Sequence, residues 1–287
     1  MKTIYRTPES KAAVLALYDA QMKKLGLPFH DLSVETSFGA THLVEIGNPE
    51  GKPLLVFHGG NSTTAYNLLA CRFLLDTFHV YAADIVGHPG RSAETSLSPG
   101  GEAYGEWAGE VIGGLGMKSM RCFGGSFGAG VLAKLMCACP EKVSRAVLCV
   151  PSGIHNALPL SSVKMLLPLL RYRRKGDAED VRRAAMCMSV TADALDEDTL
   201  DTVRMSFEHV KTKMGMPGNV SAKRMARCKA PTLVMAGEKD ILFPAGKVLP
   251  RARRIIPDCR TYLLEGRGHI HQLTDGEQAM IVDFLNQ

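Results

Sequence analysis

Apolar and polar residues follow two distinct patterns along this chain. Short apolar runs bounded by glycine, proline or polar residues are typical of strands. They lie at residues 32–35, 42–46, 53–57, 79–83, 117–123 and 145–150, and within residues 230–240 and 260–269. Stretches with apolar residues at helical spacing lie at residues 10–25, where Ser10 is the expected cap, 64–76, 101–115 and 131–138. Strands that alternate with helices predict an α/β protein with a mostly parallel sheet, covered by helices on both faces.

This alternation stops after the sixth strand-like run, at residues 145–150. One helix would normally lead to the next strand, but the next apolar run comes only after residue 230. Helix-periodic segments fill the interval around residues 161–171, 177–188, 196–213 and 221–228. We therefore expect one α/β core, made of residues 1–153 and 230–287, with a helical cap at residues 154–229 inserted after the sixth strand.

Length and composition agree with a single α/β core. A chain of 287 residues with 46% hydrophobic residues can bury one large core but not two. The N-terminus lacks the apolar stretch of a secretion signal, and no segment has 18 uncharged apolar residues, so we expect a soluble cytoplasmic protein. The eight cysteines, Cys122 and Cys149 among them, are then most simply reduced thiols in the core.

A serine lies between a strand-like run and an apolar helix, in the sequence RCFGGSFGAG at residues 121–130. The chain must reverse there within a few residues, so we expect Ser126 to have the strained backbone that presents a nucleophile. Gly124 and Gly128 are expected because a Cβ at either position would collide with the adjoining strand and helix. The G-x-S-x-G pattern also arises by chance in glycine-rich chains, so its weight depends on the other motifs.

Three further strand-like runs end in residues of the kinds that a serine nucleophile needs beside it. The first leads to His58 and two glycines, whose N–H groups can bind an oxyanion. The second leads to Asp240 and the third to His269 in a glycine loop. The chain order serine, aspartate, histidine, each beyond a strand end, is typical of the α/β-hydrolases.

From about residue 30 onward the chain resembles the α/β-hydrolase superfamily, and in particular its capped bacterial carboxylesterase-like members. The matching stretches are HGG at 58–60, DIVGHPGRS at 84–92, the serine turn, GEKD at 237–240 and GH at 268–269. The resemblance implies the α/β-hydrolase fold, with a mostly parallel eight-stranded sheet flanked by helices and a cap that roofs the active site.

The resemblance also implies roles for individual residues. Ser126 is the expected nucleophile, His269 the general base and Asp240 the acid that orients it. The backbone N–H groups of Gly60 and Phe127 are the expected oxyanion hole. The family often has a histidine immediately before the serine, where this chain has Gly125.

These roles predict a carboxylesterase that acts on small or medium, largely apolar esters through an acyl-enzyme, with no cofactor and no metal. The same machinery serves thioesters, lactones, amides and carbon–carbon bonds, so the bond type stays open. A serine nucleophile argues against epoxide hydrolases and haloalkane dehalogenases, which use an aspartate. Aminopeptidase relatives bind a free amine with acidic cap residues, whereas this cap is basic. A ligand-binding sensor with little turnover is the alternative from another class.

The net charge of +5 is concentrated at residues 171–175, 182–183 and 251–254. Acidic residues follow the first run and no aromatic platform accompanies it, which favours a solvated helix face over a nucleic-acid surface. We expect a small-molecule substrate, no nucleic acid and no membrane partner; the sequence indicates no oligomeric state. His269 and His271 have H-x-H spacing, but the further ligands of a metallohydrolase are not near them.

Several other residues have a structural interpretation that we favour. Asp84 follows a strand and is an alternative acid, but we expect it, with His88 and Arg91, to stabilise its own turn. His58 is expected to support the oxyanion loop rather than act as a base. Tyr104 and Trp107 share a helix turn and are expected in the core or near the pocket. Of the seven cap methionines, we expect about two to face the substrate: Met165, Met186, Met188, Met205, Met214, Met216 and Met225.

Overall fold

The computed structural model describes residues 3–157, 163–211 and 215–287, and gives only the backbone of residues 163–166. Its strands are β1 (Phe29–Thr36), β2 (Gly39–Gly47), β3 (Lys52–Phe57), β4 (Phe78–Ala83), β5 (Met120–Gly125), β6 (Val143–Cys149), β7 (Thr232–Gly237) and β8 (Cys259–Leu264). They form one eight-stranded sheet in the order β1-β2-β4-β3-β5-β6-β7-β8. β2 pairs antiparallel with β1 and β4, and all other neighbours are parallel. The mostly parallel eight-stranded sheet is therefore confirmed.

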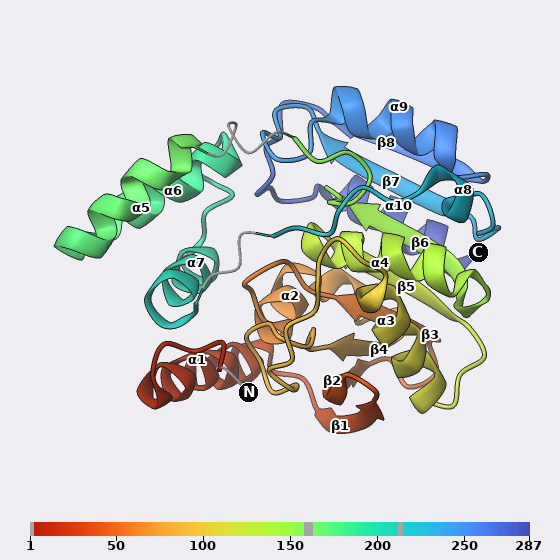
Figure 1. Ribbon diagram of the computed structural model, residues 1–287, viewed down its shortest axis with the longest axis horizontal. Coiled ribbons are helices and arrows are strands. Elements are labelled where there is room, and N and C mark those ends of the chain that lie inside the picture. Colours follow the sequence, from red (N-terminus) through yellow and green to blue (C-terminus); the bar gives the residue numbers. More distant parts are fainter. Residues whose placement is uncertain (1–2, 158–162, 212–214) are drawn as a thin grey trace.

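Helices cover both faces of this sheet (Figure 1). The helices of the core are α1 (Pro8–Leu25), α2 (Thr64–Ala70), α3 (Ala103–Gly114), α4 (Phe127–Ala138), α9 (Ala245–Ile255) and α10 (Asp275–Asn286). α3, α4 and α9 enclose one hydrophobic cluster with the sheet, and α1, α2 and α10 enclose the other. On β3, Leu55 and Phe57 join the first cluster while Leu54 and Val56 join the second. A central strand buried on both faces is continuously apolar, which explains the runs in the sequence.

Among the described residues between β6 and β7 there are four helices, as the periodicity predicts: α5 (Val163–Lys175), α6 (Ala178–Ser189), α7 (Glu197–His209) and α8 (Ala222–Met225). α5 and α6 pack on each other as a hairpin that projects from the body of the molecule, and α7 lies beside α1 and α2 (Figure 1). α8 instead packs on α4 and α9, and its Met225 belongs to the main hydrophobic cluster. The projecting part of the insertion therefore consists of α5 and α6.

The N-terminal segment before α1 binds the end of α7 through backbone contacts. Tyr5 forms an antiparallel bridge with Val210, and the N–H of Arg6 donates to the carbonyl of His209 (2.9 Å). The expectation that Ser10 caps α1 is wrong, because the hydroxyl of Thr7 accepts the hydrogen bond from the Ser10 N–H (3.1 Å). Pro8 starts the helix earlier, since its fixed φ suits the first helical position. Within the described ranges, no helix combines the length and apolar character needed to cross a bilayer.

Candidate active site

Ser126 stands at the turn from β5 into α4 with φ 53° and ψ −114°, a conformation that residues with a side chain rarely adopt. A Cβ on Gly124 would lie 2.6 Å from the carbonyl oxygen of Gly128, and one on Gly128 would overlap the carbonyl of Phe57 on β3. Both glycines are thus required by close backbone approach, as the sequence predicts. The strained serine turn is confirmed as well.

Hydrogen bonds from the end of β6 hold this turn in place. The N–H of Ser126 donates to the carbonyl of Cys149 (2.9 Å). The carbonyl of Ser126 accepts from both the N–H and the hydroxyl of Ser152 (3.2 Å each). The backbone of Ser126 is therefore fixed on both sides, and its side chain is left to make other contacts.

The side chain of Ser126 belongs to a chain of hydrogen bonds with His269 and Asp240. Its Oγ lies 2.8 Å from Nε2 of His269, and Nδ1 of His269 lies 2.9 Å from Oδ2 of Asp240. Asp240 follows β7, and His269 lies in the loop between β8 and α10, so the carboxyl ends of three parallel strands supply the three residues. A carboxylate only accepts, which assigns the proton to Nδ1 and leaves Nε2 free to accept from the serine hydroxyl.

Asp240 is held as an anion. It is 3% exposed, and burial alone would raise the pKa of a carboxyl group. His269 and the N–H groups of Phe243 (3.0 Å) and Leu242 (2.8 Å) outweigh burial and keep the pKa of Asp240 below its usual range. The ring of Phe243 also packs edge-on against the His269 imidazole, with centroids 5.2 Å apart. These contacts fix the orientation of the imidazole.

The backbones of Gly60 and Phe127 are adjacent beside the serine. A Cβ built on Gly60 would lie 3.2 Å from Cβ of Phe127. Phe127 is the first residue of α4, where an N–H has no acceptor within the helix and the helix dipole favours negative charge. The two residues predicted to supply the oxyanion hole thus lie side by side, and Phe127 is at a helix N-terminus.

His58 supports the loop that carries Gly60. Its Nε2 accepts from the N–H of Ile85 (3.0 Å), and its Nδ1 donates to the carbonyl of Gly59 (2.7 Å). Burial lowers the pKa of His58, so the ring stays neutral in this arrangement. Both ring nitrogens are engaged, which agrees with the supporting role expected from the sequence.

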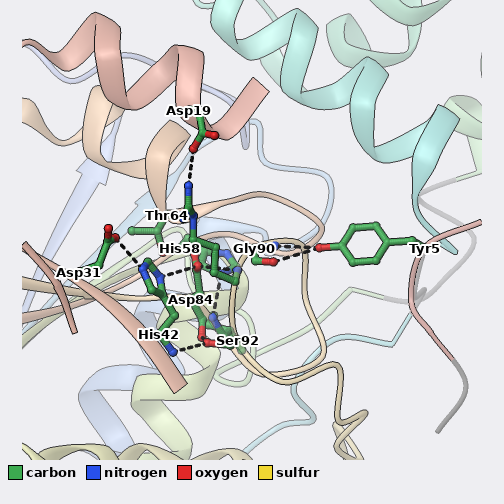
Figure 2. A network of polar contacts seen from close by, with 11 residues as sticks. Tyr5, Asp19, Asp31, His42, His58, Thr64, Asp84, Gly90 and Ser92 are labelled. Carbon is green, nitrogen blue, oxygen red and sulfur yellow. Dashed lines mark hydrogen bonds and ion pairs between the residues drawn. The ribbon is translucent and has the colours of Figure 1, made fainter. Parts of the chain in front are cut away.

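Asp84 is the centre of a separate polar network, shown in Figure 2. It is fully buried and accepts hydrogen bonds from the N–H of Arg91 (2.8 Å), the N–H of Thr64 (3.4 Å) and Nδ1 of His42 (3.0 Å). Asp240, and not Asp84, is therefore the carboxylate bonded to His269. Asp84 instead ties its own turn to the start of α2 and to β2, as a structural residue would.

The sequence did not single out His42, which lies between two carboxylates in this network. Its Nε2 is 2.8 Å from Asp31 and its Nδ1 is bonded to Asp84 (Figure 2). Burial lowers the pKa of His42, but the two carboxylates outweigh it and raise the pKa above the usual value. The feature of the sequence that could have identified His42 is a histidine in a strand whose other residues are largely apolar. The hydroxyl of Tyr5 adds two bonds to the backbone of Gly90 in the same turn (3.1 and 3.2 Å).

The aromatic pair on α3 is part of the core. Trp107 is fully buried, and its Nε1 donates to the hydroxyl of Thr41 (2.8 Å). Tyr104 is buried edge-on against the ring of Phe127, with centroids 5.3 Å apart. Tyr104 therefore supports the residue that follows Ser126.

The insertion reaches the loop of His269 through the end of α6. The N–H of Ile270 donates to the carbonyl of Met188 (3.1 Å), and a Cβ on Gly268 would overlap the same carbonyl. Among the methionines between residues 154 and 229, Met205 is buried with the N-terminal segment and Met225 in the core. Met186 and Met188 are half-buried, whereas the side chain of Met165 and all of Met214 fall outside the described residues.

Comparison with known proteins shows the family and the fold to which the chain is similar. Residues 49–275 match the family described as "Serine aminopeptidase, S33". The chain is 22% identical over 277 residues to "Carboxylesterase YbfK" of Bacillus subtilis (strain 168), covering 94% of this chain and 91% of that one. The crystal structure of that carboxylesterase has a TM-score of 0.80 at 21% identity, covering 96% of this chain and 98% of the other.

Two further solved structures share the fold. Naproxen esterase (carboxylesterase NP) of Bacillus subtilis has a TM-score of 0.79 at 19% identity, with 97% of each chain covered. The meta-cleavage product hydrolase of Pseudomonas fluorescens IP01 has a TM-score of 0.69 at 18% identity, covering 91% of this chain and 98% of the other.

Proposed function

Because the chain belongs to the serine aminopeptidase (S33) family of α/β-hydrolases, we propose that it is a serine hydrolase with carboxylesterase activity on small or medium, largely apolar esters. The observation that carries this proposal is the chain of hydrogen bonds from Ser126 through His269 to Asp240, at 2.8 and 2.9 Å. Nucleophile, base and orienting carboxylate are the three groups that acyl transfer requires.

In the proposed acylation, Oγ of Ser126 attacks the ester carbonyl carbon while Nε2 of His269 takes the hydroxyl proton. The N–H groups of Gly60 and Phe127 stabilise the negative charge that develops on the carbonyl oxygen. The bond to the alcohol oxygen then breaks, and His269 returns the proton to the departing alcohol. The acyl group stays on Ser126.

Deacylation repeats these steps with water. His269 takes a proton from the water molecule as its oxygen attacks the acyl carbon. The carboxylic acid leaves when the bond to Oγ of Ser126 breaks, and His269 returns the proton to the serine. Asp240 stays ionised throughout and stabilises the imidazolium in both halves of the reaction, as its lowered pKa favours.

Charge in the insertion favours an esterase over an aminopeptidase. Aminopeptidase members of the family bind the free amine of their substrate through acidic cap residues. The α5–α6 hairpin instead exposes Arg171, Arg173, Arg174 and Lys175 at the end of α5. A positive cap repels an ammonium group, so a neutral ester is the better substrate class.

Thioesters, lactones and carbon–carbon bonds are alternative substrates for the same residues. A ligand-binding sensor is the alternative from another class. The eight cysteines form no disulfide with one another among the described residues, which fits the cytoplasmic location that we propose. We propose a small-molecule substrate and neither nucleic acid nor membrane as partner.

Hydrolysis of p-nitrophenyl esters with acyl chains from acetyl to octanoyl tests the proposal. Purified protein is expected to turn over the shorter esters and the Ser126→Ala variant to lose that activity. An amino-acid p-nitroanilide serves as the counter-substrate and should be hydrolysed poorly. Activity that survives in Ser126→Ala, or a preference for the anilide, would contradict the carboxylesterase proposal.

A further inference from the structure

The loop that carries His269 has no regular secondary structure, since β8 ends at Leu264 and α10 begins at Asp275. Its position relative to Ser126 therefore depends on individual contacts. A misplacement of about 1 Å in such a site can lower a rate about 100-fold. Contacts that join this loop to the serine turn are thus important for the reaction.

One such connection runs through two side chains that take no part in the chemistry described above. Sγ of Cys149, the last residue of β6, lies 3.7 Å from Nε2 of His271. Nδ1 of His271 lies 3.0 Å from the carbonyl oxygen of His269. The carbonyl of Cys149, in turn, accepts the hydrogen bond from the N–H of Ser126 (2.9 Å).

The direction of these hydrogen bonds follows from the chemistry of each group. A carbonyl oxygen only accepts, so the proton of the His271 ring is on Nδ1 and Nε2 has a free lone pair. The thiol of Cys149 must then be the donor to Nε2. Burial raises the pKa of Cys149 to about 12 and lowers the pKa of His271, so the thiol keeps its proton and the ring stays neutral.

We propose that Cys149 and His271 are positioning residues that set the distance between Ser126 and His269. Cys149 holds the backbone of the serine through its carbonyl, and it holds the backbone of the histidine through its thiol and His271. This inference rests on the proposed function, because it concerns the approach of the nucleophile to its base. This role requires neither residue to touch the substrate or to exchange a proton with it.

The variants His271→Ala, His271→Asn, Cys149→Ala and Cys149→Ser test this arrangement. His271→Ala removes the link and should lower kcat about 10- to 100-fold, with KM within about twofold of the original value. Asparagine places an amide N–H near the position of Nδ1 but does not reach the thiol of Cys149, so His271→Asn should lower kcat less than His271→Ala and about as much as Cys149→Ala. Cys149→Ala should lower kcat about 3- to 10-fold, whereas Cys149→Ser, which keeps a donor, should stay within about twofold.

Cys122→Ala is the matched control, because Cys122 is a buried thiol on the neighbouring strand β5 whose sulfur donates to the carbonyl of Met120, within its own strand. It should lower the melting temperature about as much as Cys149→Ala but leave kcat unchanged. The double variant Cys149→Ala/His271→Ala should be no slower than His271→Ala, since the two residues act through one connection.

The rate at which a small fluorophosphonate reacts with Ser126 provides a second readout, independent of ester preference. It should fall by the same factors as kcat. Unchanged kcat and phosphonylation rates in both alanine variants would overturn the positioning role, as would an effect confined to KM. Ester hydrolysis that survives Ser126→Ala would instead refute the proposed function, so the two failures are distinguishable. If His271→Ala does not fold, the two Cys149 variants decide the question by themselves.

Discussion

The carbonyl oxygen of Met188, at the end of α6, accepts a hydrogen bond from the N–H of Ile270, the residue that follows His269 (3.1 Å). The insertion therefore contacts the backbone of the proposed base. The α5–α6 hairpin otherwise projects from the core (Figure 1). We propose that this hairpin is a lid whose inner end forms one wall of the substrate site.

Substitution of Met188 or Met186 by alanine should change the preference among ester chain lengths, because both side chains are half-buried at the end of α6, where the carbonyl of Met188 contacts the His269 loop. The measurement is kcat/KM across a series of acyl chains, beside the rate of reaction with a small phosphonylating reagent. The kcat/KM for the longest acyl chains should change by about tenfold or more relative to that for the shortest, while the reagent reacts with Ser126 at nearly the original rate.

Met225→Ala is the control for this experiment. Met225 is completely buried in the core, so its loss should cost about 2–5 kcal/mol of stability without altering the chain-length preference. An unchanged preference in both the Met186 and the Met188 variants would argue against the lid.

The proposed triad should act as a unit. Ser126→Ala and His269→Ala are each expected to lower kcat by about 10³- to 10⁶-fold, and the double variant should be little slower than either. The reason is that the serine hydroxyl and its base contribute to one transition state, and neither accelerates the reaction alone. Steady-state rates of the three variants with one ester check this, and losses that multiply in the double variant would show that the roles are wrongly assigned.

Gly124 and Gly125 should respond in opposite ways to alanine. A Cβ at Gly124 would lie 2.6 Å from the carbonyl oxygen of Gly128, so Gly124→Ala should cost about 1–3 kcal/mol or more of the free energy of unfolding. No described atom outside the local backbone lies within 4 Å of a Cβ at Gly125, so Gly125→Ala should be close to neutral. Urea unfolding of the two variants is the test, and equal stabilities would contradict the predicted backbone contact.

The pair His42–Asp84 should make stability depend on pH. Burial lowers the pKa of His42, but Asp84 and Asp31 outweigh it and raise the pKa above the unfolded value of about 6.5. The stabilisation is therefore fully present below about pH 6.5 and is lost as the pH rises through the raised pKa of the folded state.

His42→Asn keeps an N–H near Nδ1 but cannot be charged, so it isolates this effect. The difference in free energy of unfolding between the original protein and His42→Asn should be largest near pH 6 and should shrink toward about pH 9. His58 and His271, whose pKa values burial lowers, are present in both proteins and their contributions cancel. A difference that stays constant with pH would contradict the charged pair.

The sequence predicts the approach of Ser126, His269 and Asp240 because each follows a strand. The carboxyl ends of parallel strands meet at one edge, so order along the chain is sufficient there. It does not predict the bond between His42 and Asp84, because that bond depends on the antiparallel pairing of β2 with β4. Local pattern identifies strands but not their partners.

Two other differences between the expected and the observed structure have local causes. Thr7 and Ser10 are both suitable helix caps, and Pro8 selects the first of them. The periodicity of residues 221–228 correctly predicts a helix but not the surface against which it packs. α8 lies on α4 and α9 because Met225 and Cys228 join the main core, although these residues fall inside the range expected for the cap.

The bridge between Tyr5 and Val210 has a consequence for the order in which the protein folds. The side chain of Arg6 also donates to the carbonyl of Phe207, a contact that joins residues 201 positions apart. During synthesis the first segment leaves the ribosome long before its partner exists, so this contact forms only after most of the chain is made. Closure of the segment around Tyr5 on α7 is thus a late event in folding.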